Sequence, residues 1–459
     1  MNRKVTSSLI VFTLLVTVSL VSCEEGKLSS SPVSDSSETS GSLTSTSDST
    51  SDLKKNQLTE EDFLSTKNTS FITKGNEQVS LRGTNVGNLY VQESWMATVT
   101  SSCLLNTMNV LTSNYGKTKA YELMDTYSDA YWNESDFINC ANLGMNVLRL
   151  PISYIDVYDV DFSLLVKSDL TASEFNSMSF TVREDHLKKI DSFIKTAGEY
   201  GIYTILDLHG AFGSQNGNDH SVDCLNGDRL WQDSDLGKAF QEKTTDLWTL
   251  LATRYKDNYN VAGYDVLNEP AGDTTNGVTT STQYTYFDEL YQAIRKVDSS
   301  HVIFFESCWD GYHLPVPSKY GWTNICYEFH HYEWSNKNDD DYQYNSLVKA
   351  MTNILARNFN VPIYLGEFRL FTSTDSKNTW KKGLSFLNEK NINWTTWTYQ
   401  VKKGSNWGIY NFGDCEDAII NSTDDCDTYE TIKTKWSSMR NDLTLNEVLS
   451  SAISETLLN

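Results

Sequence analysis

Eight short segments rich in β-branched and aromatic residues recur through most of this chain, and amphipathic stretches separate many of them. Such alternation favours βαβ units, in which helices connect parallel strands. The apolar centres of the segments suit strands that are buried on both faces. The segments are QVSLRGTNVG (78–87), MNVLRLPI (145–152), IYTILDLHG (202–210), VAGYDVLNEP (261–270), HVIFFESCW (301–309), NICYEFHHY (324–332), PIYLGEFRLF (362–371) and NWTTWTYQ (393–400). The pattern predicts an α/β fold, a (β/α)8 TIM barrel.

The stretches between these segments have the apolar spacing of helices that pack one face against a core. Residues 183–201 are the clearest case, and their apolar face consists of Leu187, Ile190, Phe193, Ile194 and Ala197. Residues 235–257 and 345–359 repeat the spacing, which predicts further helices. After position 413 the chain is acidic and then helical over 429–443, and we expect this tail to close the barrel.

Polar residues interrupt the apolar pattern at the carboxyl end of six segments. These residues are Arg149, Asp207, His209, Asn268, Glu269, His330, His331, Tyr332, Glu367 and Trp397. In a parallel barrel all carboxyl ends meet on one face, where barrel enzymes have their active sites. Packing alone does not explain the same interruption in six independent strands. The sequence therefore predicts an active site on this face.

The N-terminus has the pattern of an export signal. A basic MNRK precedes the apolar run LIVFTLLVTVSLV, which is short for a membrane span. Residues 20–23, LVSC, are similar to a bacterial lipobox, so residues 1–23 are predicted to be a signal peptide with a lipid-modified Cys23. The alternative is an ordinary cleaved signal in which Cys23 is incidental. Either reading places the protein outside the cell, and the lipobox reading places it on the cell surface as a membrane-anchored lipoprotein.

A Ser/Thr-rich segment follows the signal. Between positions 28 and 53, 16 of 26 residues are Ser or Thr, a composition that buries too little apolar surface to fold. We predict a disordered linker over residues 24–57 and a single barrel domain over residues 58–459.

Charge and cysteine content exclude some functions. The net charge of −23 opposes binding to nucleic acid or to an anionic bilayer, but it is neutral towards sugars. Seven cysteines remain after Cys23, and no C-x-x-C or HExxH spacing indicates a metal site. Cys415 and Cys426 are close enough in sequence to form a bridge, and Cys308 and Cys326 are expected in the core. We expect no metal and no cofactor.

Seven blocks in this order resemble glycoside hydrolase family 5, the cellulase and exo-β-1,3-glucanase family. The blocks are LRGTNVGNLYVQESWM, LGMNVLRLPISY, ILDLHGAFGSQNGNDHS, GYDVLNEP, HHY, LGEF and WTYQ. The resemblance extends from about Phe71 to about Asn411. Matched one by one, the family's residues around the cleaved bond fall on Arg149, His209, Asn268, Glu269, His330, Tyr332, Glu367 and Trp397.

The resemblance implies a retaining hydrolysis in which Glu269 is the acid/base and Glu367 the nucleophile. Such a reaction needs one protonated and one ionised carboxyl group about 5–5.5 Å apart. We expect Arg149 and Tyr332 to hold Glu367 as an anion. A neighbouring carboxylate should make Glu269 hold its proton more firmly.

The neighbouring residues are expected to bind the sugar. Asn268 is placed to donate to the sugar 2-OH, a contact that strengthens in the transition state. Trp397 offers an apolar floor for the sugar ring.

The exo-β-1,3-glucanase branch is the first choice for the substrate. In that branch a Glu and an Asp-Asn pair bind the terminal sugar, and here Glu93 and Asp219 match, but His220 occupies the Asn position. The branch's Phe clamp is also altered, with Asn218 at one position and Ser335, beside Trp334, near the other. The substrate is therefore expected to be a β-glucan, cleaved by a monomer. An endo-β-1,4-glucanase or another β-glycanase is the alternative, and a non-catalytic surface glycan-binding protein is a more distant one.

Overall fold

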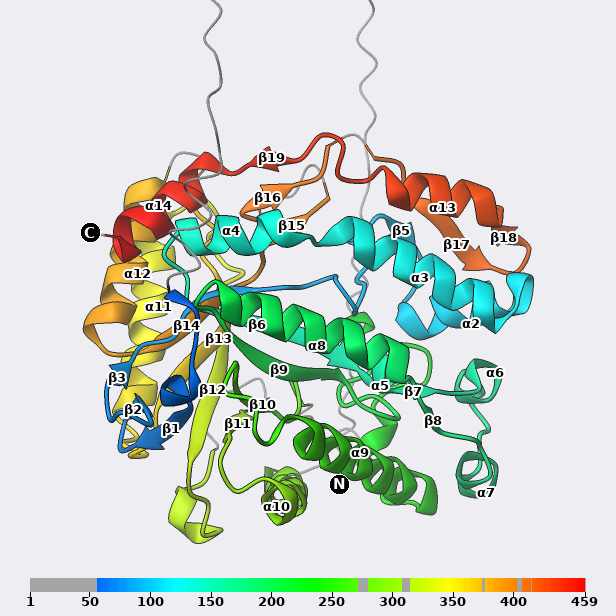
Figure 1. Ribbon diagram of the computed structural model, residues 1–459, viewed down its shortest axis with the longest axis horizontal. Coiled ribbons are helices and arrows are strands. Elements are labelled where there is room, and N and C mark those ends of the chain that lie inside the picture. Colours follow the sequence, from blue (N-terminus) through cyan, green and yellow to red (C-terminus); the bar gives the residue numbers. More distant parts are fainter. Residues whose placement is uncertain are drawn as a thin grey trace, which may run out of the picture. The chain divides into compact units, whose positions relative to one another are not determined.

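Each of the eight predicted segments forms one strand of a closed parallel barrel in the computed structural model of the protein (Figure 1). The structure describes residues 56–270, 280–307, 314–373, 376–402, 407–413 and 415–458. The strands are β4 (Arg82–Asn85), β6 (Val147–Ser153), β9 (Tyr203–Gly210), β10 (Val261–Asp265), β11 (Val302–Glu306), β12 (Ile325–Tyr332), β13 (Ile363–Arg369) and β14 (Asn393–Thr396). They pair in chain order, and β14 closes the ring on β4. The predicted (β/α)8 barrel is confirmed.

The predicted signal peptide with Cys23 lies outside the described residues, as do Cys308 and nearly all of the predicted linker. No helix in the described part of the chain is long and apolar enough to cross a membrane.

Helices lie around the strands (Figure 1). The longer ones are α2 (Leu104–Tyr115), α3 (Lys117–Tyr131), α4 (Glu134–Asn142), α8 (Glu184–Glu199), α9 (Asp235–Tyr255), α10 (Thr280–Val297), α11 (Asp340–Leu355), α12 (Lys377–Glu389), α13 (Tyr429–Ser437) and α14 (Glu447–Leu457). Short helical turns are α5 (Tyr154–Val157), α6 (Phe162–Leu165), α7 (Ala172–Asn176), η2 (Glu60–Asp62), η3 (Asp219–Ser221), η4 (Arg229–Trp231) and η6 (Pro317–Lys319). All five residues predicted for the apolar face of α8 are buried. Helix α11 begins five residues before the predicted stretch, because Asp339 caps its N-terminus by accepting a hydrogen bond from the Tyr342 amide.

Four small sheets lie outside the barrel in the described part of the chain. They contain β1 (Leu64–Lys67), β2 (Ser70–Thr73) and β3 (Gln78–Val79); β5 (Val99–Thr100), β17 (Ala418–Ser422) and β18 (Asp425–Cys426); β7 (Tyr158–Asp159) and β8 (Thr181–Val182); and β15 (Gln400–Val401), β16 (Tyr410–Asn411) and β19 (Thr444–Leu445). We expected the acidic tail to close the barrel, but it does not. It pairs β17 with β5 and packs α13 on α3 and α14 on α12, outside the ring.

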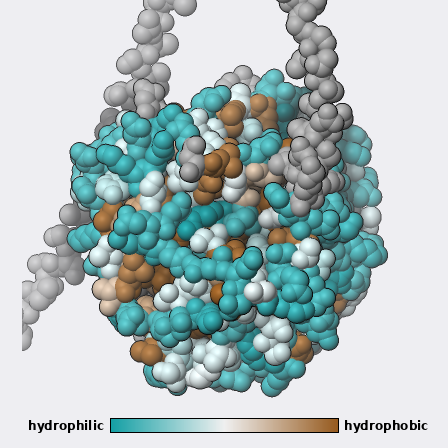
Figure 2. All heavy atoms as spheres, turned by 60° about the vertical axis from the view of Figure 1, so that its left-hand side comes forward, coloured by the Kyte–Doolittle hydropathy of each residue, from teal (hydrophilic) through white to brown (hydrophobic). Residues whose placement is uncertain are grey.

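The two ends of the barrel interior have opposite character. An apolar cluster that includes Phe71, Phe304 and Tyr364 fills the end next to the β1–β2 hairpin. Charged side chains converge at the carboxyl ends of the strands. The outer face shown in Figure 2 is largely hydrophilic, with hydrophobic residues in small separate groups.

The structure tests the two predictions made for the cysteines. Cys326 is buried on β12, as predicted. Cys426 is not part of a disulfide, so the bridge to Cys415 suggested by their spacing is not formed.

Candidate active site

Arg149 organises the bottom of the site. It is the third residue of β6, deeper in the strand than the predicted strand end, and its side chain is fully buried. Its guanidinium contacts four carboxyl groups, at 2.6 Å from Asp265, 2.8 Å from Glu367, and 3.2 Å from both Asp207 and Glu328. One cation cannot balance four anions, so protons must replace part of the negative charge. Burial raises the pKa of Asp265 and of Glu328 to about 7, and that of Asp207 well above its usual range.

Glu367 projects from β13 with a donor on each carboxyl oxygen. Arg149 Nη1 lies 2.8 Å from Oε1, and the Tyr332 hydroxyl donates to Oε2 at 2.8 Å. Both predicted partners of Glu367 are therefore in place. The preceding Gly366 leaves room for Glu328, whose Oε1 would lie 1.7 Å from a Cβ at that position. The Gly-Glu pair in LGEF thus allows two carboxyl groups to approach the same strand.

Glu269 is held by the loop that follows β10. The sequence suggested that Glu269 lies at the tip of this strand. The strand ends at Asp265, however, so Glu269 lies beyond it. The backbone of Glu269 is left-handed, with φ of 38°, a conformation that costs a non-glycine residue on the order of 1–3 kcal/mol. Two side chains hold it there: the Glu269 amide donates to Glu306 Oε2 at 2.5 Å, and Asn216 Nδ2 donates to the Glu269 carbonyl at 3.0 Å.

Two imidazoles contact the Glu269 carboxylate. His330 Nδ1 is 2.8 Å from Oε1, and His220 Nε2 is 3.1 Å from Oε2. Burial opposes ionisation of Glu269, but the hydrogen bonds from His220 and His330 outweigh it and hold the pKa of Glu269 well below its usual range. This corrects the expectation that Glu269 holds its proton firmly. The expectation considered the neighbouring carboxylate and a partly dry cleft, and it missed both imidazoles.

The two key carboxyl groups face each other across His330. Its Nδ1 is 2.8 Å from Glu269 Oε1 and 3.6 Å from Glu367 Oε2. These two oxygens can therefore be no farther apart than the sum of those distances, 6.4 Å.

His209, Asn268 and Trp397 form one side of the pocket. The His209 ring stacks on Trp397 with centroids 5.4 Å apart and planes 3° apart, and its Nδ1 is 2.7 Å from Asp207. Burial lowers the pKa of His209 to about 3, so the ring is neutral. Asn268 accepts a hydrogen bond from Arg149 Nη2 at 2.8 Å, which orients its amide.

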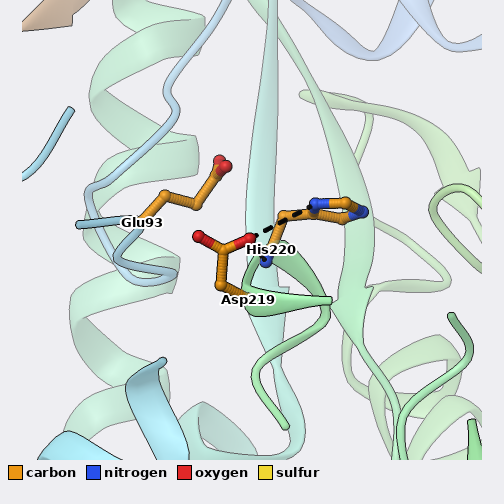
Figure 3. A group of neighbouring side chains, drawn as sticks. All are labelled: Glu93, Asp219 and His220. Atoms are coloured by element: carbon orange, nitrogen blue, oxygen red, sulfur yellow. Dashed lines mark hydrogen bonds and ion pairs between the residues drawn. The ribbon is translucent and has the colours of Figure 1, made fainter. Parts of the chain in front are cut away.

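A second cluster, made of two carboxyl groups and an imidazole, lines the same pocket (Figure 3). Glu93 follows β4, and Asp219 and His220 begin η3; the three side chains converge, with ligand atoms within 4.8 Å of one another. Glu93 is 6% exposed and accepts a hydrogen bond from Trp95 Nε1 at 2.7 Å. Burial raises its pKa to about 8. Two carboxyl groups and an imidazole are suitable metal ligands, as are Glu269, Glu306 and His330. In both groups, however, the polar atoms already engage protein partners.

These groups line a cavity of about 490 Å³. The lining residues are Glu93, Trp95, His209, Asp219, His220, Asn268, Glu269, Tyr332, Trp334, Glu367, Trp397 and Trp407. Ten residues were predicted to catalyse the reaction or to bind the sugar, and eight of them line this cavity. The other two, Arg149 and His330, contact the lining residues Glu367 and Glu269.

Sequence reasoning missed Glu306 and the three tryptophans Trp95, Trp334 and Trp407. Glu306 ends strand β11 with a carboxyl group, the same kind of signal that identified the other strand ends. Trp95 and Trp334 follow Glu93 and Tyr332 by two residues each, whereas no sequence signal distinguishes Trp407. Their rings form a connected aromatic wall, with centroids 4.9 Å apart for Trp95 and Trp407 and 5.9 Å apart for Trp334 and Trp407.

The fold and the paired carboxyl groups define the class of a barrel glycoside hydrolase, and comparison with known proteins identifies the family. The family model "Cellulase (glycosyl hydrolase family 5)" matches residues 90–403. The chain belongs to glycosyl hydrolase family 5, and it is a glycoside hydrolase.

The relatives that this chain matches are distant in sequence. A "Beta-xylosidase" of Phanerodontia chrysosporium is 29% identical over 59% of this chain and 52% of its own length. A "Probable glucan 1,3-beta-glucosidase A" of Aspergillus fumigatus is 25% identical over 77% of both chains. A "Glucan 1,3-beta-glucosidase 1" of Schizosaccharomyces pombe is 27% identical over 58% of this chain and 63% of its own length. The chain thus matches about half the length of the first of these relatives.

Solved structures share the fold. An endogalactoceramidase superposes with a TM-score of 0.53 at 16% identity, covering 85% of this chain and 84% of that one. A rutinosidase from Aspergillus niger gives a TM-score of 0.52 at 16% identity, covering 78% of this chain and 98% of that one.

Proposed function

We propose that the protein is a retaining β-glucan hydrolase that releases glucose from the ends of β-1,3-glucan. The observation that carries the proposal is the pairing of Glu269 and Glu367 across one pocket. Their facing oxygens are at most 6.4 Å apart, which is compatible with the separation of about 5–5.5 Å between the carboxyl groups of retaining enzymes. Two relatives are named as glucan 1,3-β-glucosidases, which favours this substrate.

The proposed reaction has two steps. Glu367 attacks the anomeric carbon while Glu269 delivers a proton to the glycosidic oxygen, which leaves with the rest of the glucan. Arg149 and Tyr332 direct the Glu367 carboxylate at that carbon. Glu269 then takes a proton from water, and the resulting hydroxide releases the sugar from Glu367 with net retention.

The opposite wall supports action on chain ends. Glu93 and Asp219 place two carboxyl groups in the pocket, where they can bind hydroxyl groups of a single terminal sugar. The wall formed by Trp95, Trp334 and Trp407 offers apolar faces for sugar rings. A pocket with these groups on one side suits a chain end better than a continuous strand of glucan.

Azide rescue tests the two assigned roles. In Glu367→Ala, azide should enter the vacated space and attack the anomeric carbon of an activated aryl β-glucoside, giving the α-glucosyl azide. In Glu269→Ala, azide should replace water in the second step and give the β-glucosyl azide. Glu333→Ala, which removes a carboxyl group from the end of β12 but not from the pocket, should retain activity. Unchanged hydrolysis by Glu367→Ala would overturn the mechanism.

Product analysis tests the substrate. Incubation with laminarin should release glucose alone, and carboxymethyl-cellulose and lichenan should yield little. Mixed oligomers from lichenan or cellulose would instead favour an endo-acting β-1,4-glucanase. The β-xylosidase relative supplies a further candidate, so aryl β-xyloside should be compared with aryl β-glucoside. Faster hydrolysis of the xyloside would reject glucose as the preferred sugar.

We also propose that the protein is exported and anchored to the cell surface through a lipid on Cys23. The lipobox-like LVSC and the Ser/Thr-rich segment after it support this proposal. Mass spectrometry of the mature N-terminus in the native host should find an acylated Cys23, and Cys23→Ala should shift the enzyme from the membrane fraction to the medium. An unmodified N-terminus beyond Cys23 would overturn the anchor.

A further inference from the structure

The proposed acid step raises a question about where its proton is held. Glu269 must deliver a proton, yet its two imidazole partners hold its pKa low. His330 lies on strand β12 and belongs to the strand-borne centre, the group of charged side chains that the barrel strands hold around Arg149. It also faces Glu306 and Glu367, at 3.4 and 3.6 Å. His220 differs: it lies on a loop, lines the pocket, and occupies a position where the resemblance leads us to expect Asn.

The surroundings of His220 favour its charged form. Its Nε2 contacts Glu269 at 3.1 Å, and its Nδ1 faces Asp219 at 3.8 Å, while Glu93 converges on the same group (Figure 3). The neutral ring of His209 also faces it, at 6.4 Å between centroids. Burial disfavours the charge, but the hydrogen bond and the charge of Glu269 raise the pKa of His220 to about 9.

Asn216 provides a partner for the neutral form. Its Oδ1 accepts a hydrogen bond from the Asn218 amide, so its Nδ2 is the donor group that faces His220 Nε2 at 2.9 Å. One Nδ2 hydrogen is used by the Glu269 carbonyl at 3.0 Å, and the second is available for His220. A protonated Nε2 cannot accept this hydrogen bond, whereas a deprotonated Nε2 can. The same nitrogen therefore has a partner before and after it loses its proton.

We propose that His220 is the positioning residue that holds the proton for Glu269, releasing it when the glycosidic bond breaks and turning to Asn216 once neutral. This inference rests on the proposed acid/base role of Glu269.

The protons and charges balance over the cycle. In the first step the Nε2 proton of His220 passes to Glu269 and from there to the leaving oxygen, as the anomeric carbon exchanges that oxygen for Glu367. His220 loses its positive charge in the same step in which Glu367 loses its negative one. In the second step water supplies a hydroxide to the anomeric carbon and a proton to Glu269. That proton returns to His220 as Glu367 regains its charge.

The test compares substrates that differ in their need for an acid. His220→Asn should lower kcat/KM for phenyl β-glucoside about 10²-fold, in the range expected for loss of general acid catalysis. The same variant should change kcat/KM for 2,4-dinitrophenyl β-glucoside less than threefold, because that leaving group departs without a proton. The alkaline limb of the phenyl glucoside profile should move down by at least one pH unit.

Matched variants separate this role from a structural one. His331→Asn removes a neighbouring imidazole that does not line the pocket, and both pH profiles should remain as in the wild type. Asn216→Asp should stabilise charged His220 and slow only the phenyl glucoside. An unchanged alkaline limb in His220→Asn, or equal losses on both glucosides, would overturn the inference.

Glu269→Gln distinguishes failure of the inference from failure of the proposed function. If Glu269→Gln loses activity on phenyl glucoside while His220→Asn does not, only the role of His220 is wrong. If Glu269→Gln retains full activity on phenyl glucoside, the proposed acid/base and this inference fail together.

Discussion

The barrel strands and the loops that follow them contribute different parts of this site. Strands β6, β12 and β13 hold Arg149, Tyr332 and Glu367 in a fixed register around the reacting centre. Loops carry Glu93 and His220, which face the part of the pocket that a sugar would occupy. The strand-borne part agrees with the family blocks, whereas the loop-borne part departs from them at His220. Strands thus hold the charged centre around Arg149 in register, whereas loops carry Glu269, its partner His220 and the side of the pocket with Glu93.

The largest effect is expected for Arg149→Lys, at the centre of the strand-borne part. Lysine retains the charge but cannot contact four carboxyl groups at once, because its ammonium lacks the planar fork of guanidinium. Glu367 would lose its orientation, and kcat should fall by about 10²–10³-fold, as when a preorganised charge partner is removed.

Steady-state kinetics with 2,4-dinitrophenyl β-glucoside measure this effect without the acid step. Arg229→Lys is the matched control, because Arg229 is also buried and pairs with Asp223, but it does not line the pocket. A kcat for Arg149→Lys within threefold of the Arg229→Lys value would show that the strand-borne charge is not needed.

A smaller loss is expected for Glu93→Gln on the loop side. A hydrogen bond to a charged group contributes about 1.5–3 kcal/mol, so above pH 8, where Glu93 is ionised, the loss should be about 10–100-fold in kcat/KM. The loss should appear with laminarin oligomers and aryl glucoside alike, because Glu93 would bind the terminal sugar. Exposed Glu416 provides the control, and Glu416→Gln should have no effect. Equal kinetics for both variants would remove Glu93 from the sugar site.

The sequence was sufficient to predict the strand-borne part because its signals are local and periodic. Each barrel strand has an apolar run and a polar end, and parallel pairing then brings those ends together. The exact ends of the strands were predicted less accurately. Strand β10 ends three residues before Asn268, and the chain then leaves the sheet and positions Glu269 with a left-handed backbone.

The loop-borne part could not be predicted in the same way. His220 was visible as a departure from the family, but its contact with Glu269 depends on the conformation of the β9 loop. That contact reversed the expected direction of the Glu269 pKa shift. Trp407 meets Trp95 across more than 300 residues of sequence, and no local pattern encodes such an approach.

A modest effect is expected for Trp334→Ala at the outer edge of the aromatic wall. The ring is 58% exposed and rests against Phe371 at 4.8 Å between centroids. Loss of one stacking face worth about 0.5–1.5 kcal/mol should raise KM for laminarin roughly 3- to 10-fold. The kcat for an aryl glucoside should not change, because the ring lies away from the Arg149 centre. Leu458→Ala, which removes an equally exposed apolar side chain near the C-terminus, should leave both values unchanged.

The smallest effect on activity, but a measurable one on stability, is expected for Glu328→Gln beneath the site. Burial raises the pKa of Glu328 to about 7 from the usual 4.5, so the folded protein binds more protons than the unfolded chain between these values. Its stabilising contribution is therefore complete below about pH 4.5 and is lost as pH rises through about 7. A shift of this size corresponds to about 3 kcal/mol in the free energy of unfolding.

Thermal and urea unfolding between pH 5 and 8 should show a shallower fall in stability for Glu328→Gln than for the wild type, because glutamine does not titrate. Glu455→Gln is the control: hydrogen bonds from Lys377 and Lys381 lower the pKa of Glu455 to about 2, so it stays ionised in the folded protein throughout this range. Parallel slopes for wild type and Glu328→Gln would mean that the protons shared around Arg149 reside on Asp207 or Asp265 instead.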